Sequence, residues 1–275
     1  MIRADDLGPV ELERLSLAVT RRSGIAFDAG RWPFLRTRVR EFMTRAGVTS
    51  PRRWTDEVVA SATVGGPLYA ELEQALHVHE TRFFRYPHHH RILRDTVLPE
   101  WLATAGPGAR LRVLSVGCST GEEPYSLAMT IAEAFREARR DAVEIVAIDV
   151  SPGALATATA AVYARSAIDD VPELWRTRYF RPTTNGVEVG LAIRALVRFF
   201  QHDIRREIYL GKFDVVVCCN VLLYFTDPVK ERIVKRLTGV LQRGGHLFLG
   251  HAEGVALTDA FRARHVPSGI VHQRR

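Results

Sequence analysis

The spacing of hydrophobic residues changes near residue 80 of this 275-residue chain. Before that point, apolar residues recur every three or four positions, as they do along the buried face of a helix. The pattern predicts a helix over Leu7–Arg21 with Gly24 as its stop, a second from Trp32-Pro33 to about Gly47, and a third over Pro67–Leu76. Because no strand pattern appears before residue 110, residues 1–80 are expected to form a helical N-terminal domain.

From residue 111 the pattern becomes one of short apolar runs that alternate with helical stretches. Such alternation is typical of βαβ units and a parallel sheet covered on both faces. Residues 163–196 break the alternation with several turn signals, and they are expected to form a small inserted subdomain. Residues 81–275 are thus predicted to form an α/β domain. The predicted strands are 111–118, 143–149, 197–204, 213–225 and 246–253; the predicted helices are Glu122 to about Arg136, Ser151–Val162 and Pro228–Leu241, with a turn at Gly244-Gly245.

The turn after the first predicted strand is rich in glycine and acid. In an open parallel sheet, ligands bind beyond the carboxyl ends of the strands. Gly117 and Gly121 have the spacing G-x-x-x-G, which matches neither the dinucleotide pattern G-x-G-x-x-G nor the phosphate-binding G-x-x-x-x-G-K. Glu122 and Glu123 would also repel a phosphate. A ligand with ribose hydroxyls and a positive centre fits better, and S-adenosylmethionine has both.

The other strand ends carry further polar candidates. Asp149 can accept two hydrogen bonds from a ribose diol, or alternatively cap the next helix, although Ser151 is available as its N-cap. Asp203 could accept from an adenine amino group while Ile204 packs on the ring; equally, Asp203 could be a simple turn residue. Asn220 can satisfy ligand polar groups through its amide. Tyr224 could hydrogen-bond at the reaction centre or belong to the core, as could Phe225, and the N-P-P-Y motif of base methylation is absent.

A segment rich in aromatic residues and histidines precedes the α/β region. Phe83 and Phe84 stand between two arginines, where they could stack on nucleic acid or, more commonly, pack in a core. Consecutive histidines at 88–90 would point in different directions on a helix, so no metal site is expected. The cysteines cannot build a disulfide framework, which favours a reducing compartment. They are Cys118, Cys218 and Cys219.

The chain is basic, with 38 basic and 31 acidic residues and a formal net charge of +7. The excess is concentrated between Gly30 and Arg53, where seven arginines face one acid. Along the second predicted helix Arg31, Arg38 and Arg45 follow each other at intervals of seven and would form one stripe. Such a stripe suits an acidic protein partner, nucleic acid or anionic lipid, or is simply a solvated face. No apolar run is long enough to cross a membrane and the N-terminus lacks a signal peptide, so a cytoplasmic location is expected.

These segments together resemble the chemotaxis receptor methyltransferase family of CheR type. The matching pieces lie in the family's order and spacing over essentially the whole chain, and the run S-T-G-E-E-P-Y-S is the most specific of them. They are Glu80–Arg85, Ser119–Ser126, Asn220–Phe225 and Gly250–Glu253. The resemblance implies a class I S-adenosylmethionine-dependent methyltransferase domain with a small antiparallel β insert, preceded by the helical domain. It also implies a cytoplasmic monomer that methylates glutamates on the cytoplasmic helices of methyl-accepting chemotaxis receptors, without nucleic acid or membrane insertion.

The resemblance also implies individual roles. His79 replaces the family's usual asparagine, Cys219 its arginine and Ala252 its serine. Arg31, Arg38 and Arg45 would bind the receptor, and we expect Arg85 and Tyr224 to flank the methyl-transfer site. Cofactor contacts fall on His79, Thr81, Arg85, Glu123, Asp149, Asp203, Ile204, Asn220 and Val221.

The expected chemistry needs no general base, because a glutamate with a pKa near 4.3 is already ionised at neutral pH. The absence of a Ser/His/Asp or Cys/His constellation is therefore consistent with it. Two alternatives remain at this stage. One is a class I methyltransferase acting on nucleic acid or a small molecule, and the other is a receptor-binding module without catalysis.

Overall fold

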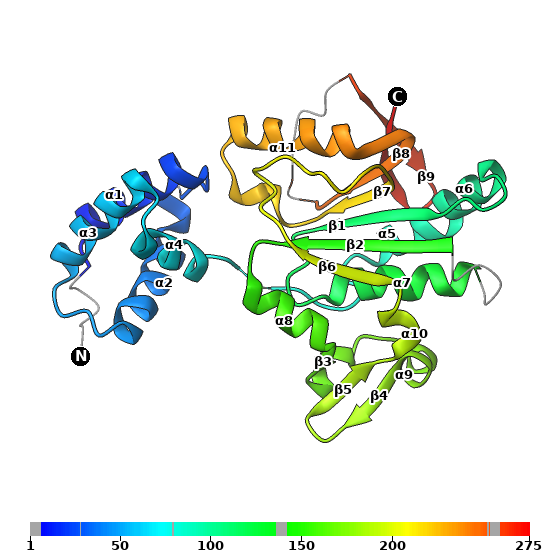
Figure 1. The fold of residues 1–275 in the computed structure, drawn as a ribbon, viewed down its shortest axis with the longest axis horizontal. Coiled ribbons are helices and arrows are strands. Elements are labelled where there is room, and N and C mark those ends of the chain that lie inside the picture. Colours follow the sequence, from blue (N-terminus) through cyan, green and yellow to red (C-terminus); the bar gives the residue numbers. More distant parts are fainter. Residues whose placement is uncertain (1–6, 28, 79, 136–141, 252, 254–258) are drawn as a thin grey trace. The chain divides into compact units, whose positions relative to one another are not determined.

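A computed structural model of the chain describes residues 7–27, 29–78, 80–135, 142–251, 253 and 259–275 (Figure 1). By its internal contacts the chain divides into two compact units. The first comprises Met1–Val78 and Tyr224–Lys230, and the second His79–Leu223 and Glu231–Arg275. Each unit has its own hydrophobic core.

The first unit is helical. The helix α1 ends where Gly24 adopts the left-handed conformation, with φ of 73°, as its glycine predicts. The predicted helices are confirmed, and their apolar faces, including Leu12 and Val39, are fully buried. One helix was not predicted individually: α3, which begins at a proline. The helices are α1 (Pro9–Ser23), α2 (Trp32–Arg45), α3 (Pro51–Val64) and α4 (Pro67–Ala75).

The arginine stripe of α2 is shorter than predicted. The helix begins at Trp32, because proline is well tolerated in the first turn. Arg31 lies just before it, in a 3-10 turn, and donates a hydrogen bond to the carbonyl of Ala26 at 3.3 Å. Its guanidinium also lies 5.5 Å from the centre of the Tyr224 ring. Placing Arg31 on the helical stripe was therefore wrong, and α2 itself carries Arg38 and Arg45.

The described residues of the second unit form a seven-stranded sheet in the order β6-β2-β1-β7-β8-β10-β9. The first five of these strands are parallel and confirm a strand in each predicted segment, but β7 ends at Cys218 rather than at Phe225, and β8 covers Leu241–Leu249 rather than 246–253. The antiparallel β9 and β10 were not predicted. Gly244 and Gly245 lie within β8, where the pairing with β7 shifts register, rather than in a turn before it. The strands are β1 (Leu111–Val116), β2 (Val143–Asp149), β6 (Val197–Gln201), β7 (Phe213–Cys218), β8 (Leu241–Leu249), β9 (Phe261–Val266) and β10 (Gly269–Arg274).

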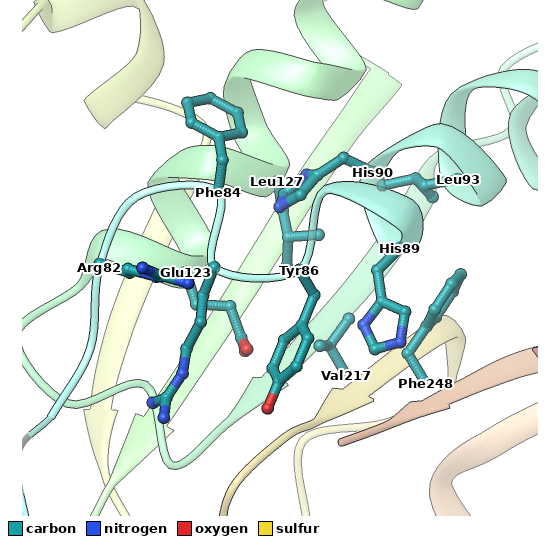
Figure 2. A pocket seen from close by; sticks show the side chains of 11 residues that line it. Arg82, Phe84, Tyr86, His89, His90, Leu93, Glu123, Leu127, Val217 and Phe248 are labelled. Atoms are coloured by element: carbon teal, nitrogen blue, oxygen red, sulfur yellow. The ribbon is translucent and has the colours of Figure 1, made fainter. Parts of the chain in front are cut away.

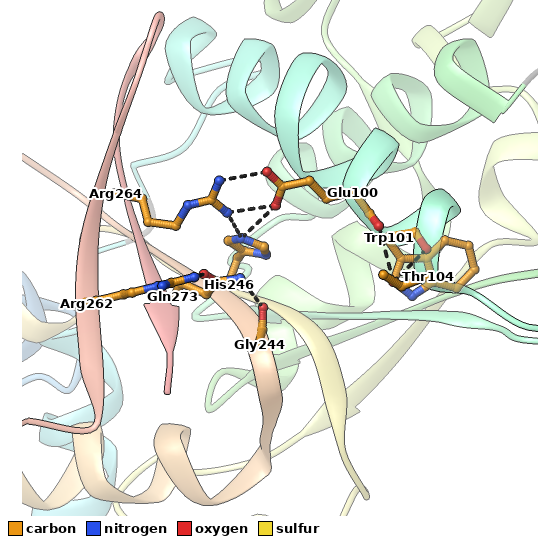
Figure 3. A network of polar contacts seen from close by, with 8 residues as sticks. All are labelled: Glu100, Trp101, Thr104, Gly244, His246, Arg262, Arg264 and Gln273. Carbon is orange, nitrogen blue, oxygen red and sulfur yellow. Dashed lines mark hydrogen bonds and ion pairs between the residues drawn. The ribbon is translucent and has the colours of Figure 1, made fainter.

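Helices pack against this sheet. The helices α7 and α8 contact β2 and β6, and α5 contacts β10. A network of polar contacts ties α6 to the far strands: Glu100 accepts two hydrogen bonds from Arg264 of β9, both of 2.7 Å, beside His246 of β8 (Figure 3). The segment from α5 to α6 was not predicted. The helices are α5 (Pro87–Ile92), α6 (Leu98–Thr104), α7 (Glu122–Phe135), α8 (Pro152–Ala160) and α11 (Asp227–Val240), with a π-helical stretch at Leu93–Val97.

The predicted inserted subdomain is a small antiparallel sheet in the order β3-β5-β4. It lies next to the short helices α9 and α10 (Figure 1). The antiparallel insert is thus confirmed. Its elements are β3 (Val162–Tyr163), α9 (Glu173–Tyr179), β4 (Phe180–Thr183), β5 (Gly186–Val189) and α10 (Leu191–Arg194).

Candidate functional site

The order of the strands reverses between β1 and β7. The chain proceeds from β1 outward through β2 to β6, and then returns to the other side of β1 with β7 and β8. Ligands of open α/β sheets bind at the carboxyl ends of the strands at such a reversal. The segments that follow the strands at this edge, called here the carboxyl edge, carry most of the predicted cofactor residues. They are 117–123, Asp149, Asp203-Ile204, Asn220-Val221, Gly250-His251 and Glu253.

The turn after β1 needs its glycines. Gly117 has φ of 66°, and a Cβ there would stand 2.4 Å from a methyl group of Val221. Gly121 has φ of 99°, and its Cβ would stand 2.9 Å from the Cβ of Ala158. Both positions therefore exclude larger side chains, which lets the turn fold closely against the segment after β7 at Gly117 and against α8 at Gly121.

Asp149, at the end of β2, holds this turn in place. Its carboxylate accepts hydrogen bonds from the backbone N–H of Ser119 at 2.8 Å and of Ser151 at 2.9 Å. Ser151 is the N-cap of α8, since its hydroxyl accepts from the N–H of Ala154. A carboxylate has about four acceptor sites, so these bonds leave capacity for a ribose hydroxyl. The cofactor role of Asp149 stays a prediction.

Glu123 is an acid whose proton is held unusually firmly. Burial raises its pKa to about 7, and the neighbouring carboxylate of Glu253 adds to the effect. A hydrogen bond from the Ser115 hydroxyl at 2.7 Å and the charge of Arg85 act in the opposite direction. Near neutral pH this carboxyl group is therefore poised between its two forms, which is typical of functional sites.

The carboxylate of Asp203 accepts hydrogen bonds from the nearby Arg205. Burial alone would raise the pKa of Asp203, but hydrogen bonds from the side chain and backbone of Arg205 hold it below its ordinary value. The guanidinium of Arg205 contacts both carboxylate oxygens, at 2.8–3.0 Å. Ile204 is buried, with 8% of its surface exposed. The turn-residue interpretation therefore has direct support, and the adenine contact stays a prediction.

The segment after β7 is held by a residue that the sequence analysis did not assign to the site. Glu253 is buried, and its carboxylate accepts from the backbone N–H groups of Val221 at 2.6 Å, Leu222 at 2.7 Å and Gly250 at 2.6 Å. Asn220 has φ of 61°, a strained value that asparagine tolerates. The signal for Glu253 was its place in the segment 250–253, directly after the last predicted strand.

Arg85 and Tyr86 approach the carboxyl edge from the stretch before α5. The guanidinium of Arg85 donates to the carbonyl of Glu80 at 2.6 Å, and the hydroxyl of Tyr86 donates to Oδ1 of Asn220 at 2.7 Å. Glu123 and Tyr86 also line a cavity of about 20 Å³, which has room for about one water molecule (Figure 2). Tyr86 was not singled out from the sequence, where nothing indicated its contact with Asn220.

The aromatic pair before α5 packs in the core. Phe83 is 2% exposed and contacts the rings of Tyr163 and Phe180 edge-on. Phe84 has φ of 53° and contacts the ring of Trp175. The core-packing interpretation therefore holds for Phe83, and this side chain presents no exposed ring to nucleic acid.

Two of the three consecutive histidines share their neighbours: the rings of His88 and His89 both lie against those of Tyr86 and His251, whereas His90 contacts Phe84. His88 stacks on His251 with ring centres 4.6 Å apart. Burial lowers the pKa of His89 to about 3 and that of His90 to about 4. At neutral pH His89 and His90 are therefore uncharged.

The remaining predicted site residues are dispersed. Thr81 is half-buried in the irregular stretch before α5. Tyr224 belongs to the first unit, so its pairing with Arg85 stays a prediction, as do the receptor contacts of Arg38 and Arg45. His79 and Ala252 lie outside the described residues.

Strained backbone also gathers at the carboxyl edge. Among the described residues, four that are not glycine have positive φ, and two of them, Ser119 and Asn220, lie in the segments that follow β1 and β7. Such strain persists where the surroundings enforce it, and it clusters at functional sites. A seven-stranded, mainly parallel sheet with this acidic, glycine-hinged edge defines an α/β ligand-binding domain suited to a cationic nucleoside.

Comparison with known proteins identifies the class. A family model described as "CheR methyltransferase, SAM binding domain" matches residues 79–270. The chain is therefore an S-adenosylmethionine-dependent methyltransferase, and it belongs to the CheR methyltransferase family. It is 31% identical over 275 residues to chemotaxis protein methyltransferase Cher2 of Pseudomonas putida, which covers 98% of this chain and 99% of that protein. It is 33% identical over 274 residues to chemotaxis protein methyltransferase 1 of Pseudomonas aeruginosa, covering 96% and 98%.

The described residues fit S-adenosylmethionine as the cofactor. The carboxyl edge offers the carboxylates of Glu123 and Asp149 to a ligand that carries hydroxyl and ammonium donors, and the amide of Asn220 adds a neutral polar group. The glycines of the turn after β1 let a ligand come close to the backbone, and the turn lacks the sequence of a phosphate-binding loop. Among the described helices, none is both long and apolar enough to span a membrane.

Proposed function

We propose that the protein transfers the methyl group of S-adenosylmethionine to glutamate carboxylates on the cytoplasmic helices of methyl-accepting chemotaxis receptors. The observation that carries the proposal is the family match over residues 79–270, together with relatives that are named chemotaxis methyltransferases and align with nearly the whole chain. The acid-lined carboxyl edge supports it, because a sulfonium donor is cationic and would be stabilised there.

In this proposal the cofactor is held by the residues that the resemblance assigned. Asp149 would accept from the ribose and Glu123 from the ammonium group, and Asn220 and Val221 would make further contacts with the cofactor. Bound there, S-adenosylmethionine supplies an electrophilic methyl group. The remaining proposed contacts are His79, Thr81, Arg85, Asp203 and Ile204.

The chain's own residues then need to align the acceptor rather than activate it. The acceptor glutamate is ionised at neutral pH, and holding two reactants in line can contribute roughly 7–11 kcal/mol. We assign this positioning to Arg85 and to Tyr224. Arg85 is suited to it because its side chain is only 27% exposed and its guanidinium is anchored by the carbonyl of Glu80.

The receptor would be held by the first unit. Arg38 pairs with Glu41 at 3.2 Å, and the two side chains are 38% and 50% exposed. An exposed pair of this kind contributes about 0–1 kcal/mol, so a receptor carboxylate can replace Glu41 at little cost. Arg45 is exposed on the same helix, about two turns further along the same stripe.

The proposal is tested by methyl transfer to defined acceptors. Purified protein and methyl-labelled S-adenosylmethionine are incubated with a receptor cytoplasmic fragment, the same fragment with its acceptor glutamates changed to glutamine, and duplex and single-stranded nucleic acid. The expected result is base-labile label in the glutamate fragment and much less in the glutamine fragment. Label in nucleic acid, or equal label in both fragments, would overturn the proposal.

A further inference from the structure

The amide of Asn220 can serve a ligand in two opposite ways. Its oxygen accepts hydrogen bonds, whereas its NH2 group donates two. Which group faces the cofactor decides whether the site recognises a donor or an acceptor there. The sequence does not indicate the orientation, but the contacts around Asn220 do.

The backbone of this segment is fixed first. Glu253 holds the N–H groups of Val221 and Leu222, and a third bond from Gly250 anchors the same carboxylate to the end of β8. There is no spare room beside it: a Cβ on Gly250 would stand 3.3 Å from the backbone nitrogen of Asn220. With the backbone held in this way, the remaining freedom of Asn220 is rotation of its side-chain amide.

Tyr86 settles that rotation. Its hydroxyl donates to Oδ1 of Asn220 at 2.7 Å, so the amide oxygen faces Tyr86 and the NH2 group faces away from it. The Tyr86 ring cannot easily move, because it lies 5.1 Å from the ring of His89 and 5.5 Å from that of His251. A Cβ on Gly250 would also stand 3.3 Å from the Tyr86 hydroxyl, which shows how closely Gly250 and Tyr86 pack together.

We propose that Tyr86 is a positioning residue that orients the Asn220 amide, so that its two N–H donors meet an acceptor group of the cofactor, a carboxylate or an adenine ring nitrogen. The inference rests on the proposed cofactor role of Asn220 and deepens it. Tyr86 acts through Asn220. Burial raises the pKa of Tyr86, so the hydroxyl keeps its proton and remains a donor throughout the neutral range.

The test is a double-mutant cycle on the binding of S-adenosylhomocysteine, measured by titration calorimetry with the full chain. Losing one hydrogen bond of about 1 kcal/mol, at 1.4 kcal/mol per tenfold, should make Tyr86→Phe bind about fivefold more weakly. Asn220→Ala should bind more weakly still. The double variant should match Asn220→Ala, because Tyr86 has nothing left to orient.

Three outcomes would overturn the proposal. The first is unchanged affinity in Tyr86→Phe. The second is a fivefold loss that persists in the Asn220→Ala background, which would show a role independent of Asn220. The third is unchanged affinity in Asn220→Ala, which would remove the cofactor role of Asn220 itself, while receptor methylation would still report on the wider function.

The orientation is tested separately by Asn220→Asp. This change replaces the NH2 group by an oxygen of nearly equal size, and the proposal expects at least a tenfold loss of affinity. Retained affinity would mean that the cofactor donates to Asn220, and it would contradict the assigned orientation. Tyr179→Phe is the matched control, since the Tyr179 hydroxyl donates to Glu133 of α7, and its affinity should stay within twofold of the unaltered protein.

Discussion

The carboxylate of Glu253 accepts hydrogen bonds from the backbone N–H groups of Val221 and Leu222, at 2.6 and 2.7 Å, across 32 and 31 residues of chain. The bonds join the segment after β8 to the segment after β7, at the edge where the cofactor is proposed to bind. A buried carboxylate with three backbone donors fixes the local conformation without itself needing to contact the ligand.

Glu253→Gln should weaken both folding and cofactor binding. Glutamine keeps one acceptor oxygen and turns an NH2 group toward a backbone N–H, which leaves a buried donor unpaired at a cost of about 1–3 kcal/mol. We expect a lower midpoint of thermal unfolding and a several-fold weaker affinity for S-adenosylhomocysteine. Calorimetry measures both.

The matched control is Glu207→Gln, whose carboxylate forms an exposed ion pair with Arg236. This variant should change neither quantity appreciably, because exposed pairs contribute little. If Glu253→Gln is as stable as the control and binds as tightly as the unaltered protein, the role given to Glu253 is wrong.

Cofactor affinity should depend on pH through Glu123. Its pKa of about 7 means that the carboxyl is mostly protonated at pH 6 and mostly ionised at pH 8. Because the ionised form attracts the ammonium group, the affinity for S-adenosylhomocysteine should rise by about tenfold over this range. Titrations at a series of pH values check this, and Glu123→Gln should bind with little pH dependence between those limits.

The raised pKa of Glu123 also makes the stability of the cofactor-free protein depend on pH. This stability should fall as pH rises, whereas the cofactor affinity should increase. A carboxyl whose pKa is raised on folding binds protons more tightly in the folded state, so it lowers stability as pH rises from its ordinary pKa near 4.5 to about 7. The difference in unfolding free energy between Glu123→Gln and the unaltered protein should therefore grow over that interval. A difference that is constant with pH would show that the Glu123 pKa is not raised.

The arginines of α2 should affect the methylation of the receptor but not the affinity for the cofactor. Changing Arg38 and Arg45 together to glutamate reverses the charge of the exposed face and should reduce receptor methylation, most strongly at low salt. S-adenosylhomocysteine affinity should stay unchanged. Arg243→Glu, an exposed change in β8, is the control. Loss of cofactor binding in the double variant would point to misfolding, and unchanged methylation would remove α2 from the receptor contact.

Arg85 and Tyr224 should each be needed for the transfer step. Tyr224→Phe is expected to lower kcat at least tenfold with little effect on cofactor affinity, and Arg85→Ala should lower kcat/KM further, because Arg85 is also a proposed cofactor contact. Tyr209→Phe is the control, since that side chain is 89% exposed. Turnover within twofold of the unaltered protein in both variants would show that neither residue acts in the reaction.

The parallel strands were predictable because strands buried on both faces are continuous apolar runs. The antiparallel strands β9 and β10 were not, since Phe261–Val266 of the edge strand β9 mixes arginine and histidine with apolar residues and half of it is exposed. Their pairing depends on contacts such as that of Glu100 with Arg264, 164 residues apart, which no local pattern reveals.

The candidate site likewise contains residues that the sequence could predict and residues that it could not. Candidates such as Asp149 and Asn220 were recognisable because they stand at strand ends, where the fold class places ligands. The supporting contacts were not recognisable, because they join residues distant in sequence: Tyr86 and Asn220 are 134 residues apart. Arg31 was misplaced because a regular interval of seven says nothing about where a helix begins.

The most direct test of the account is a crystal structure of the protein with S-adenosylhomocysteine. The account predicts the ligand at the carboxyl edge, with ribose hydroxyls about 2.7 Å from the Asp149 carboxylate, at ordinary hydrogen-bond distance, and the amino group beside Glu123. A ligand bound elsewhere, or one whose ribose faces away from Asp149, would contradict it.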